Sequence, residues 1–167
     1  VARVKAGELD AVILALPYEG PGIETVPLYE EKFRVVAPAK HALARRKSVA
    51  VEELDAGELL LLPVGHCFRD QVLDACHEFS RPPEAGRQGN SIETLRSMVA
   101  SGLGVSVLPA TALTARHANP LVKAVQFTAP CPMRRVALAS RRGFHRSVAL
   151  AKLASAIRGL HLPITRL

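Results

Sequence analysis

The stretch NSIETLRSMVASGLGVSVLP, residues 90–109, contains a helix and a strand that punctuating residues delimit at both ends. Asn90 or Ser91 is expected to cap the helix, because a short polar side chain there accepts hydrogen bonds from the free amides of the first turn. Apolar residues recur at helical spacing as far as Gly102, a residue that favours the end of a helix. The apolar run 105–108 follows and is stopped by Pro109, which predicts a buried strand.

Strand-like and helix-like patterns alternate outward from this stretch in both directions. Short apolar runs predict strands at residues 11–16, 33–37 and 58–63, with residues 27–31 directly before the second of them. The run 11–16 is continuous, so we expect it to be buried on both faces. Helical spacing predicts one helix over residues 68–79, with Val72 and Cys76 on its apolar face, and a final helix over residues 145–160. This order predicts an α/β fold with a largely parallel sheet.

The composition is that of a chain that can bury a substantial core. Of its 167 residues, 49% are hydrophobic and 22% are charged, which argues against disordered, collagen-like and coiled-coil classes. The longest apolar stretches, residues 11–17 and 59–64, fall far short of the roughly 20 residues that a membrane helix needs. Three cysteines do not fit a secreted disulfide scaffold. We therefore expect a cytoplasmic protein with no membrane partner, and the start at Val1 leads us to expect a fragment of a longer chain.

Charge is distributed unevenly along the sequence. Residues 1–93 hold 11 basic and all 15 acidic side chains, a net charge of −4, whereas residues 94–167 hold 11 basic side chains and no acidic one, a net charge of +11. Such a single-sign segment is suggestive of a polyanionic partner. The favoured alternative is that these bases spread over several faces and keep the domain soluble, because no basic and aromatic residues are interleaved for stacking on nucleic-acid bases.

The usual nucleotide, hydrolase and zinc motifs receive little support. Gly102 and Gly104 resemble the start of a dinucleotide fingerprint, but they follow a helix and precede a strand, which is the reverse of what that site needs. The segment GHCFRDQVLDACH, residues 65–77, holds two cysteines and two histidines. Zinc cysteines usually stand two to four residues apart, whereas eight residues separate Cys67 from Cys76. We expect no metal and no organic cofactor.

Cys67 is expected at the corner between a strand and the following helix. In open α/β sheets that corner is where ligands and reactive groups gather. The positive end of the helix dipole, with His66 and Arg69 adding positive charge, would stabilise a thiolate there and make it reactive toward peroxide. The alternative is an inert, half-buried cysteine.

Cys76 falls on the apolar stripe of the predicted helix, so it should be buried and unreactive. Nine residues of helix span about 13.5 Å. A disulfide needs Cα atoms within roughly 7 Å. A Cys67–Cys76 bond would therefore require the helix to unravel, which couples thiol oxidation to a change of packing.

The sequence GHCFRDQVLDAC, followed by SIETLRSMVASGLGVSVLPA, resembles the effector domain of the OxyR family, the hydrogen-peroxide sensors among the LysR-type transcriptional regulators. The likeness covers nearly the whole chain, and the GHC stretch with a second cysteine nine positions on is specific to that family. The resemblance implies that Cys67 is the peroxidatic cysteine and Cys76 its resolving partner. It also implies that His66, Arg69, Asp70 and Arg134 surround the thiol. Cys131 matches no functional cysteine of the family and is expected to be structural.

The resemblance also implies a fold of two Rossmann-like subdomains, as in periplasmic binding proteins. Subdomain I would comprise residues 1–30 and 137–167, without its first β-α-β stretch, and subdomain II would comprise residues 31–136 with the redox cysteines. The family's DNA-binding winged helix-turn-helix is absent from this chain.

The expected function is a regulatory domain that converts hydrogen peroxide into a disulfide and so remodels residues 65–90. Its expected partners are a second copy of itself, as a dimer or a tetramer, and, through the full-length protein, DNA and RNA polymerase. One alternative is a LysR-type effector domain that binds a small metabolite between its subdomains, with incidental cysteines. Another is a thiol peroxidase, which we disfavour because a helix would have to unfold in every cycle, so we expect no enzyme.

Overall fold

The computed structural model describes residues 1–76 and 87–167, and the chain forms two compact units. Unit 1 comprises Val1–Glu31 and Arg134–Leu167, and unit 2 comprises Lys32–Met133. The 16-residue strand β2, Ile23–Pro38, begins in unit 1 and continues into unit 2. Each unit therefore contains one part of the same strand, and each is described by itself below.

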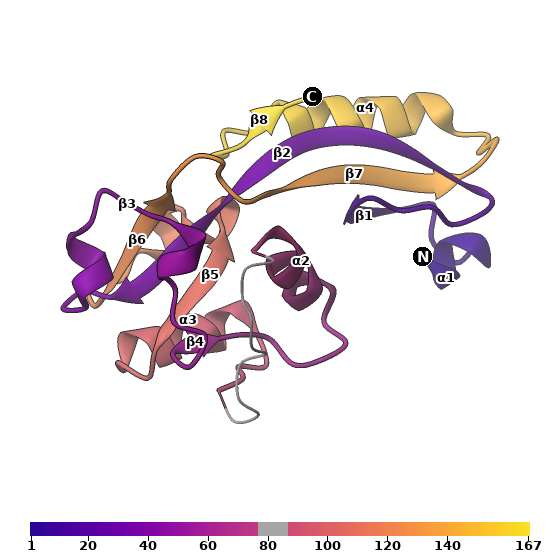
Figure 1. The fold of residues 1–167 in the computed structure, drawn as a ribbon. Helices are drawn as coiled ribbons and strands as arrows, with labels where there is room; N and C mark the ends of the chain where they lie inside the picture. The colour runs from indigo at the N-terminus through magenta and orange to yellow at the C-terminus, as the bar shows by residue number, and fades with distance from the viewer. Residues whose placement is uncertain (77–86) are drawn as a thin grey trace. The chain divides into compact units, whose positions relative to one another are not determined.

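Unit 1 is a small sheet with a helix along it (Figure 1). Strand β7, Met133–Arg141, lies between β1, Ala11–Leu16, and β2, and the short β8, Thr165–Arg166, pairs with β2. The helices are α1, Ala2–Lys5, and α4, Ser147–Arg158. Leu28, Leu138 and Ala154 form one buried cluster between α4 and the sheet, and Val4, Ile23 and Ala139 form another.

Unit 2 has the strand order β4-β5-β2-β6-β3. The strands are β3, Ser48–Val49, β4, Leu59–Leu60, β5, Val105–Pro109, and β6, Val122–Phe127. The helices are α2, Cys67–Ala75, and α3, Ile92–Ala100, with short 3-10 turns η1, Ala42–Arg45, η2, Val51–Glu53, η3, Ala110–Leu113, and η4, Ala115–His117. Val35 of β2 lies opposite Val107 of β5 and Val125 of β6, at the centre of a large apolar core.

The α/β fold is confirmed, but the sheet is mostly antiparallel and not largely parallel as predicted. Both halves of β2 pair antiparallel with their neighbours, and only β3 with β6 and β4 with β5 are parallel among the described strands. Parallel neighbours need a crossover connection, and the helices between β4 and β5 provide one. Elsewhere β2 pairs with strands from distant parts of the chain, which local alternation of strands and helices does not reveal.

Two strand predictions differ in detail from the structure. The strand predicted at residues 33–37 is part of the longer β2, which also includes residues 27–31. The run 11–16 is not buried on both faces, since 52% of the Ile13 surface is exposed. Among the described strands β1 pairs with β7 alone, so it is an edge strand. The final helix is confirmed and begins at Ser147.

The helix predicted within residues 90–109 forms as expected and gives a stability test. The hydroxyl oxygen of Ser91 accepts a hydrogen bond from the Thr94 amide at 3.1 Å, and Gly102 follows the helix at φ +78°. Ser91→Ala removes this cap and is expected to cost about 1 kcal/mol of unfolding free energy. Ser97, whose hydroxyl donates to the Glu93 carbonyl within the same helix, is the control. Ser97→Ala should change the unfolding free energy by less than about 0.5 kcal/mol in urea titrations.

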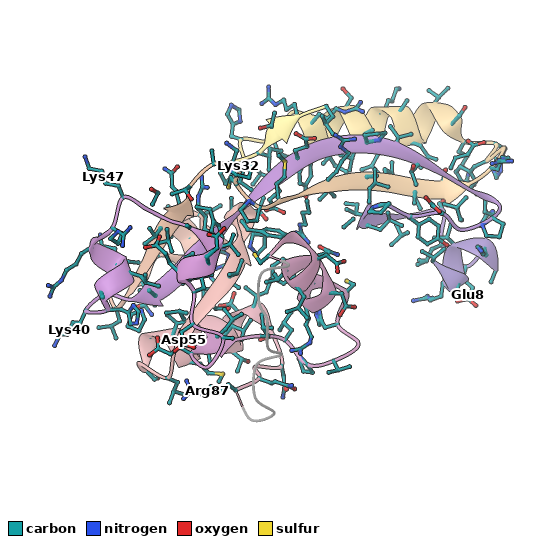
Figure 2. The ribbon with its side chains drawn as sticks, in the orientation of Figure 1. Glu8, Lys32, Lys40, Lys47, Asp55 and Arg87 are labelled. Carbon is teal, nitrogen blue, oxygen red and sulfur yellow. The ribbon has the colours of Figure 1, made fainter. Side chains whose placement is uncertain are left out.

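The charge asymmetry along the chain is partly neutralised by folding. At least five of the bases after residue 93 form ion pairs with acidic residues from the first 93: Arg96–Glu93, Arg134–Glu31, Arg135–Glu30, Arg142–Glu24 and Arg146–Asp10. Within residues 1–93, Lys32, Lys40 and Lys47 are exposed, and Figure 2 shows Lys40 and Lys47 projecting outward beside η1. Among residues 1–76 and 87–167, no helix has the length and apolar character needed to cross a membrane.

Candidate functional site

Cys67 lies at a strand-to-helix corner of unit 2, as the sequence predicts. The buried residues Leu61 and Leu62 continue from β4, which pairs parallel with β5, and the chain then turns through Gly65. Gly65 has φ +89°, in the left-handed region that glycine adopts without strain. The turn delivers Cys67 to the first position of α2, and its side chain is exposed. A thiol at this position meets the unpaired amides and the positive dipole end of the helix.

His66 is the N-cap of α2. Its Nδ1 accepts a hydrogen bond from the Phe68 amide at 3.3 Å, and its carbonyl accepts from the Arg69 amide at 2.8 Å. His66 therefore fixes the start of the helix that carries the thiol.

Arg69 and Asp70 occupy opposite environments in the first turns of α2. Arg69 is buried, and its guanidinium Nη1 donates to the Leu62 carbonyl at 3.2 Å, which ties the helix back to the end of the preceding strand. Asp70 is exposed and lies in the first turn, where a carboxylate interacts favourably with the helix dipole. Both residues therefore stabilise the local geometry of the corner.

Cys76 is buried at the opposite end of α2. Helix α2 ends at Ala75, so Cys76 is its C-cap, with only 1% of its surface exposed, and Phe79 of the predicted helix lies outside the described residues. Phe68 and Val72 complete the inner face of α2, and the Phe68 ring packs edge-to-face against Phe33 at 5.6 Å between centroids. Burial, with a smaller contribution from the nearby Cys131, raises the pKa of the Cys76 thiol from 9.0 to about 12.

The three cysteines are all free thiols, in three different environments. Cys67 is exposed, Cys76 is buried, and Cys131 is partly buried, with its Sγ 3.5 Å from the Pro132 carbonyl oxygen. Cys76 follows Cys67 by nine positions along α2, a rise of about 13.5 Å. No group of three or more potential metal ligands gathers within residues 1–76 and 87–167, and His77 lies outside these ranges.

Arg134, expected beside the thiol, forms an ion pair with Glu31 in unit 1. Its Nε and Nη2 donate to one Glu31 carboxylate oxygen at 2.8 and 2.7 Å, and Glu31 is fully buried. Burial, followed by the Glu31 charge, raises the pKa of the neighbouring Tyr29, and the Arg134 charge opposes this shift.

The Glu31–Arg134 pair gives a second stability test. Arg134→Met leaves a buried carboxylate without its main counter-charge and is expected to cost about 3 kcal/mol of unfolding free energy. Arg142, whose contact with Glu24 is long at 3.9 Å and largely exposed, is the matched control. Arg142→Met should change the unfolding free energy by less than about 0.5 kcal/mol. Equal losses in the two variants in urea titrations would contradict the special role of the buried pair.

Comparison with known proteins gives the site a family context. Residues 1–160 match the LysR substrate binding domain. The chain belongs to this family. The LysR-type chain is 45% identical to "the reduced form of OxyR regulatory domain" from Pseudomonas aeruginosa, covering 94% of itself and 76% of that chain with a TM-score of 0.84. It is 42% identical to a reduced form of OxyR from N. meningitidis, covering 99% of itself and 78% of that chain with a TM-score of 0.88.

The name of one curated relative refers to a protein about twice as long as the matched region. The LysR-type chain is 41% identical to a "probable hydrogen peroxide-inducible genes activator" from Streptomyces viridosporus, over 91% of this chain and 49% of the relative. The chain spans about half the length of the curated relatives it matches. The expected identity as an OxyR-type regulatory domain with a periplasmic-binding-protein-like fold is confirmed.

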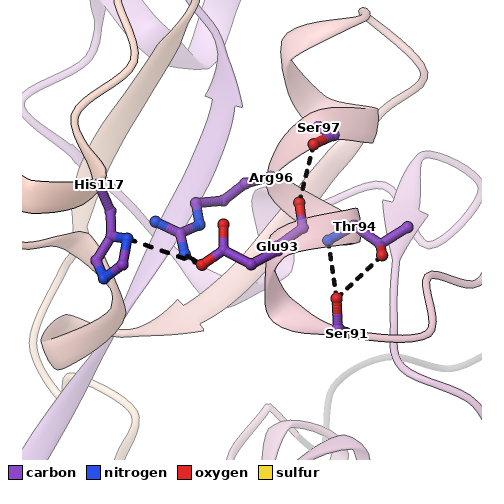
Figure 3. A network of polar contacts seen from close by, with 6 residues as sticks. All are labelled: Ser91, Glu93, Thr94, Arg96, Ser97 and His117. Atoms are coloured by element: carbon purple, nitrogen blue, oxygen red, sulfur yellow. Dashed lines mark hydrogen bonds and ion pairs between the residues drawn. The ribbon is translucent and has the colours of Figure 1, made fainter.

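One polar network of the LysR-type domain was not anticipated from the sequence. At the start of α3, the Glu93 carboxylate pairs with the buried Arg96 and lies 3.7 Å from Nδ1 of His117, which belongs to η4 (Figure 3). The spacing of Glu93 and Arg96 is that of an ion pair on one helix face. No comparable signal points to His117, because its contact depends on where η4 lies in the folded unit.

Proposed function

We propose that this domain senses hydrogen peroxide through a reversible disulfide between Cys67 and Cys76. The observation that carries the proposal is the contrast between the two thiols: Cys67 is exposed at the first position of α2, and Cys76 is buried at its end. An exposed thiol at a helix N-terminus is suited to react with a small oxidant, and a buried one is suited to couple that reaction to packing.

The chemistry needs no metal or organic cofactor. The Cys67 thiolate attacks one peroxide oxygen, the O–O bond breaks, and the leaving hydroxide takes a proton to become water. Cys67 is then a sulfenic acid. The Cys76 sulfur attacks the Cys67 sulfur, the S–O bond breaks, a second water leaves, and a disulfide remains. Cellular thiols reduce that disulfide by exchange, which returns both cysteines to the starting state.

The coupling to structure follows from the position of Cys76. The two cysteines are separated by the length of α2, far beyond the roughly 7 Å that a disulfide allows between Cα atoms. For the bond to form, α2 must unravel and Cys76 must leave the core, and the unravelling disturbs the packing of Phe68 against Phe33. We therefore propose that oxidation remodels residues 65–90, of which 77–86, with Pro82, Pro83 and Gly86, lie outside the described residues.

The remaining assignments of the resemblance are proposals of the same kind. His66, Arg69, Asp70 and Arg134 would form the surroundings of the Cys67 thiol in the reactive state. Subdomain I would comprise residues 1–30 and 137–167, and subdomain II residues 31–136. The whole protein would be a cytoplasmic transcription regulator and not an enzyme, self-associating as a dimer or tetramer, binding DNA through a winged helix-turn-helix and acting on RNA polymerase.

The proposal is tested by peptide mapping after one equivalent of hydrogen peroxide. Trypsin cleaves after Arg69, Lys123 and Arg134, so the three cysteines fall on three different peptides. We expect the peptides of Cys67 and Cys76 to be linked as the main product under non-reducing conditions. A dominant bond to Cys131, or overoxidised Cys67 alone, would overturn the assignment. Hydrogen exchange should then differ between the reduced and oxidised domain over residues 65–90, while β2 and β5 keep their protection.

The family's description as a substrate binding domain supports one other function, the binding of a small metabolite. In that case the cysteines are incidental, and a ligand that raises the melting temperature would do so equally in the Cys67→Ser variant. Identical hydrogen exchange over residues 65–90 in the two redox states would favour that alternative.

A further inference from the structure

A cavity of about 580 Å³ lies within unit 2, and Cys67 is not among the residues that line it. Its walls come from three parts of the chain: Ala50–Val51–Glu52, the end of α2 with Asp74 and Cys76, and the segment Thr128 to Met133 that leads from β6 to β7. Two of the three cysteines of the protein, Cys76 and Cys131, therefore face one cavity.

The surroundings of the two thiols differ in a way that suits a reaction between them. Cys131 is partly exposed, and its Sγ lies 3.5 Å from the Pro132 carbonyl oxygen and 3.9 Å from that of Phe33. These contacts hold the side chain to one side of the cavity. Cys76 is buried and is close enough to Cys131 for the Cys131 charge to raise its pKa. Cys131 is therefore the more accessible of the two thiols that line the cavity.

Cys76 lies at the end of α2, just outside the helix itself. Cys76 caps the helix with φ −120° and ψ 46°, outside helical geometry, while its amide still donates to the Val72 carbonyl at 3.0 Å. The side chain of a capping residue can adjust without breaking the helix before it. A bond from Cys76 to Cys67 cannot form while the helix stays intact, because the whole of α2 separates them.

We propose that Cys76 and Cys131 form a second dithiol pair, oxidised in this cavity by a low-molecular-weight disulfide, and that their bond withholds Cys76 from Cys67. The Cys131 thiolate attacks one sulfur of the small disulfide, whose S–S bond breaks and releases one thiolate. Cys76 then loses its proton to solvent and attacks the Cys131 sulfur. The second small thiolate leaves, and a Cys76–Cys131 disulfide remains, with both electrons transferred to the two released thiols.

The consequence for regulation rests on the proposed function. With Cys76 bonded to Cys131, a Cys67 sulfenic acid has no resolving partner, and α2 keeps its packing. The domain would then remain in its reduced fold in the presence of peroxide. The two disulfides compete for the Cys76 thiol. The ratio of small disulfides to small thiols around the protein would therefore set the fraction of domains that respond to peroxide.

The pair itself is tested in the Cys67→Ser variant, which removes the proposed peroxide site and leaves the cavity intact. The folded variant is incubated with oxidised glutathione and mapped after tryptic digestion. We expect the Cys76 and Cys131 peptides to be linked to each other. A stable mixed disulfide of glutathione on Cys131, or no reaction at either thiol, would overturn the proposal. Since Cys67 is absent, this result is independent of whether the domain senses peroxide.

The competition is tested in the wild-type chain treated first with oxidised glutathione and then with hydrogen peroxide. The yield of the Cys67–Cys76 linkage should fall about tenfold relative to an untreated sample. Cys131→Ser is the matched control, and it should restore the yield after the same treatment. An equal yield with and without pretreatment in the wild-type chain would overturn the competition, whereas absence of the linkage in untreated protein would count against the proposed function alone.

Discussion

Cys67→Ser is expected to abolish the response of the domain to hydrogen peroxide, whereas Cys76→Ser is expected to stop it one step later. Cys67 is the exposed thiol at the start of α2, and the first step forms the sulfenic acid on its sulfur. Without that sulfur no sulfenic acid forms, and the buried Cys76 is not reached by peroxide. In the Cys76→Ser variant the sulfenic acid forms but finds no thiol at the end of α2.

The measurement combines a sulfenic-acid probe with non-reducing peptide mapping. After one equivalent of peroxide, a dimedone-type reagent should tag Cys67 in the Cys76→Ser variant and no cysteine in the Cys67→Ser variant. Wild-type protein should show the Cys67–Cys76 linkage and little tag. Cys131→Ser is the control, and in protein kept free of other disulfides it should behave as wild type. A linkage that survives Cys67→Ser would contradict the assigned order of events.

The parts of the fold that could be predicted are those whose determinants are local. Helix α3 was predicted because Ser91 caps it and Gly102 ends it, and both act on the nearest turn of the backbone. Strand β5 was predicted from Val105, Val107 and Leu108 before Pro109. The direction of strand pairing was not predictable in this way, because β2 takes its neighbours from segments far along the chain. The exposure of Ile13 depends in the same way on which strands flank β1.

In the candidate site, too, features with local determinants could be predicted and features that depend on distant segments could not. The corner position of Cys67 and the burial of Cys76 follow from the end of one strand and the spacing of one helix. The capping role of His66 depends on ring orientation, which the sequence does not encode by spacing. That Cys131 shares a cavity with Cys76 depends on the path from β6 to β7, so the sequence alone suggested only a structural cysteine.

The second large effect is expected in thiol alkylation of the reduced, folded domain. Burial raises the pKa of the Cys76 thiol to about 12, so at pH 8 on the order of one Cys76 in ten thousand is a thiolate, against about one in four for an ordinary exposed thiol. Since the thiolate is the form that reacts, Cys67 should label about 1000-fold faster than Cys76. The rates are read from the tryptic peptides after timed quenching of iodoacetamide.

Unfolding the domain provides the control, because the contrast depends on packing and not on the chemistry of the thiols. In concentrated urea all three cysteines should label at rates within about threefold of one another. In the folded domain Cys131, which is only partly buried, should lie between the other two. Replacing Phe68 with alanine removes its edge-to-face contact with Phe33 and loosens the inner face of α2, so it should raise the Cys76 rate while leaving the Cys67 rate nearly unchanged. Equal labelling of Cys67 and Cys76 in the folded domain would show that Cys76 is not held in the core, which would contradict the proposed coupling of its oxidation to a change of core packing.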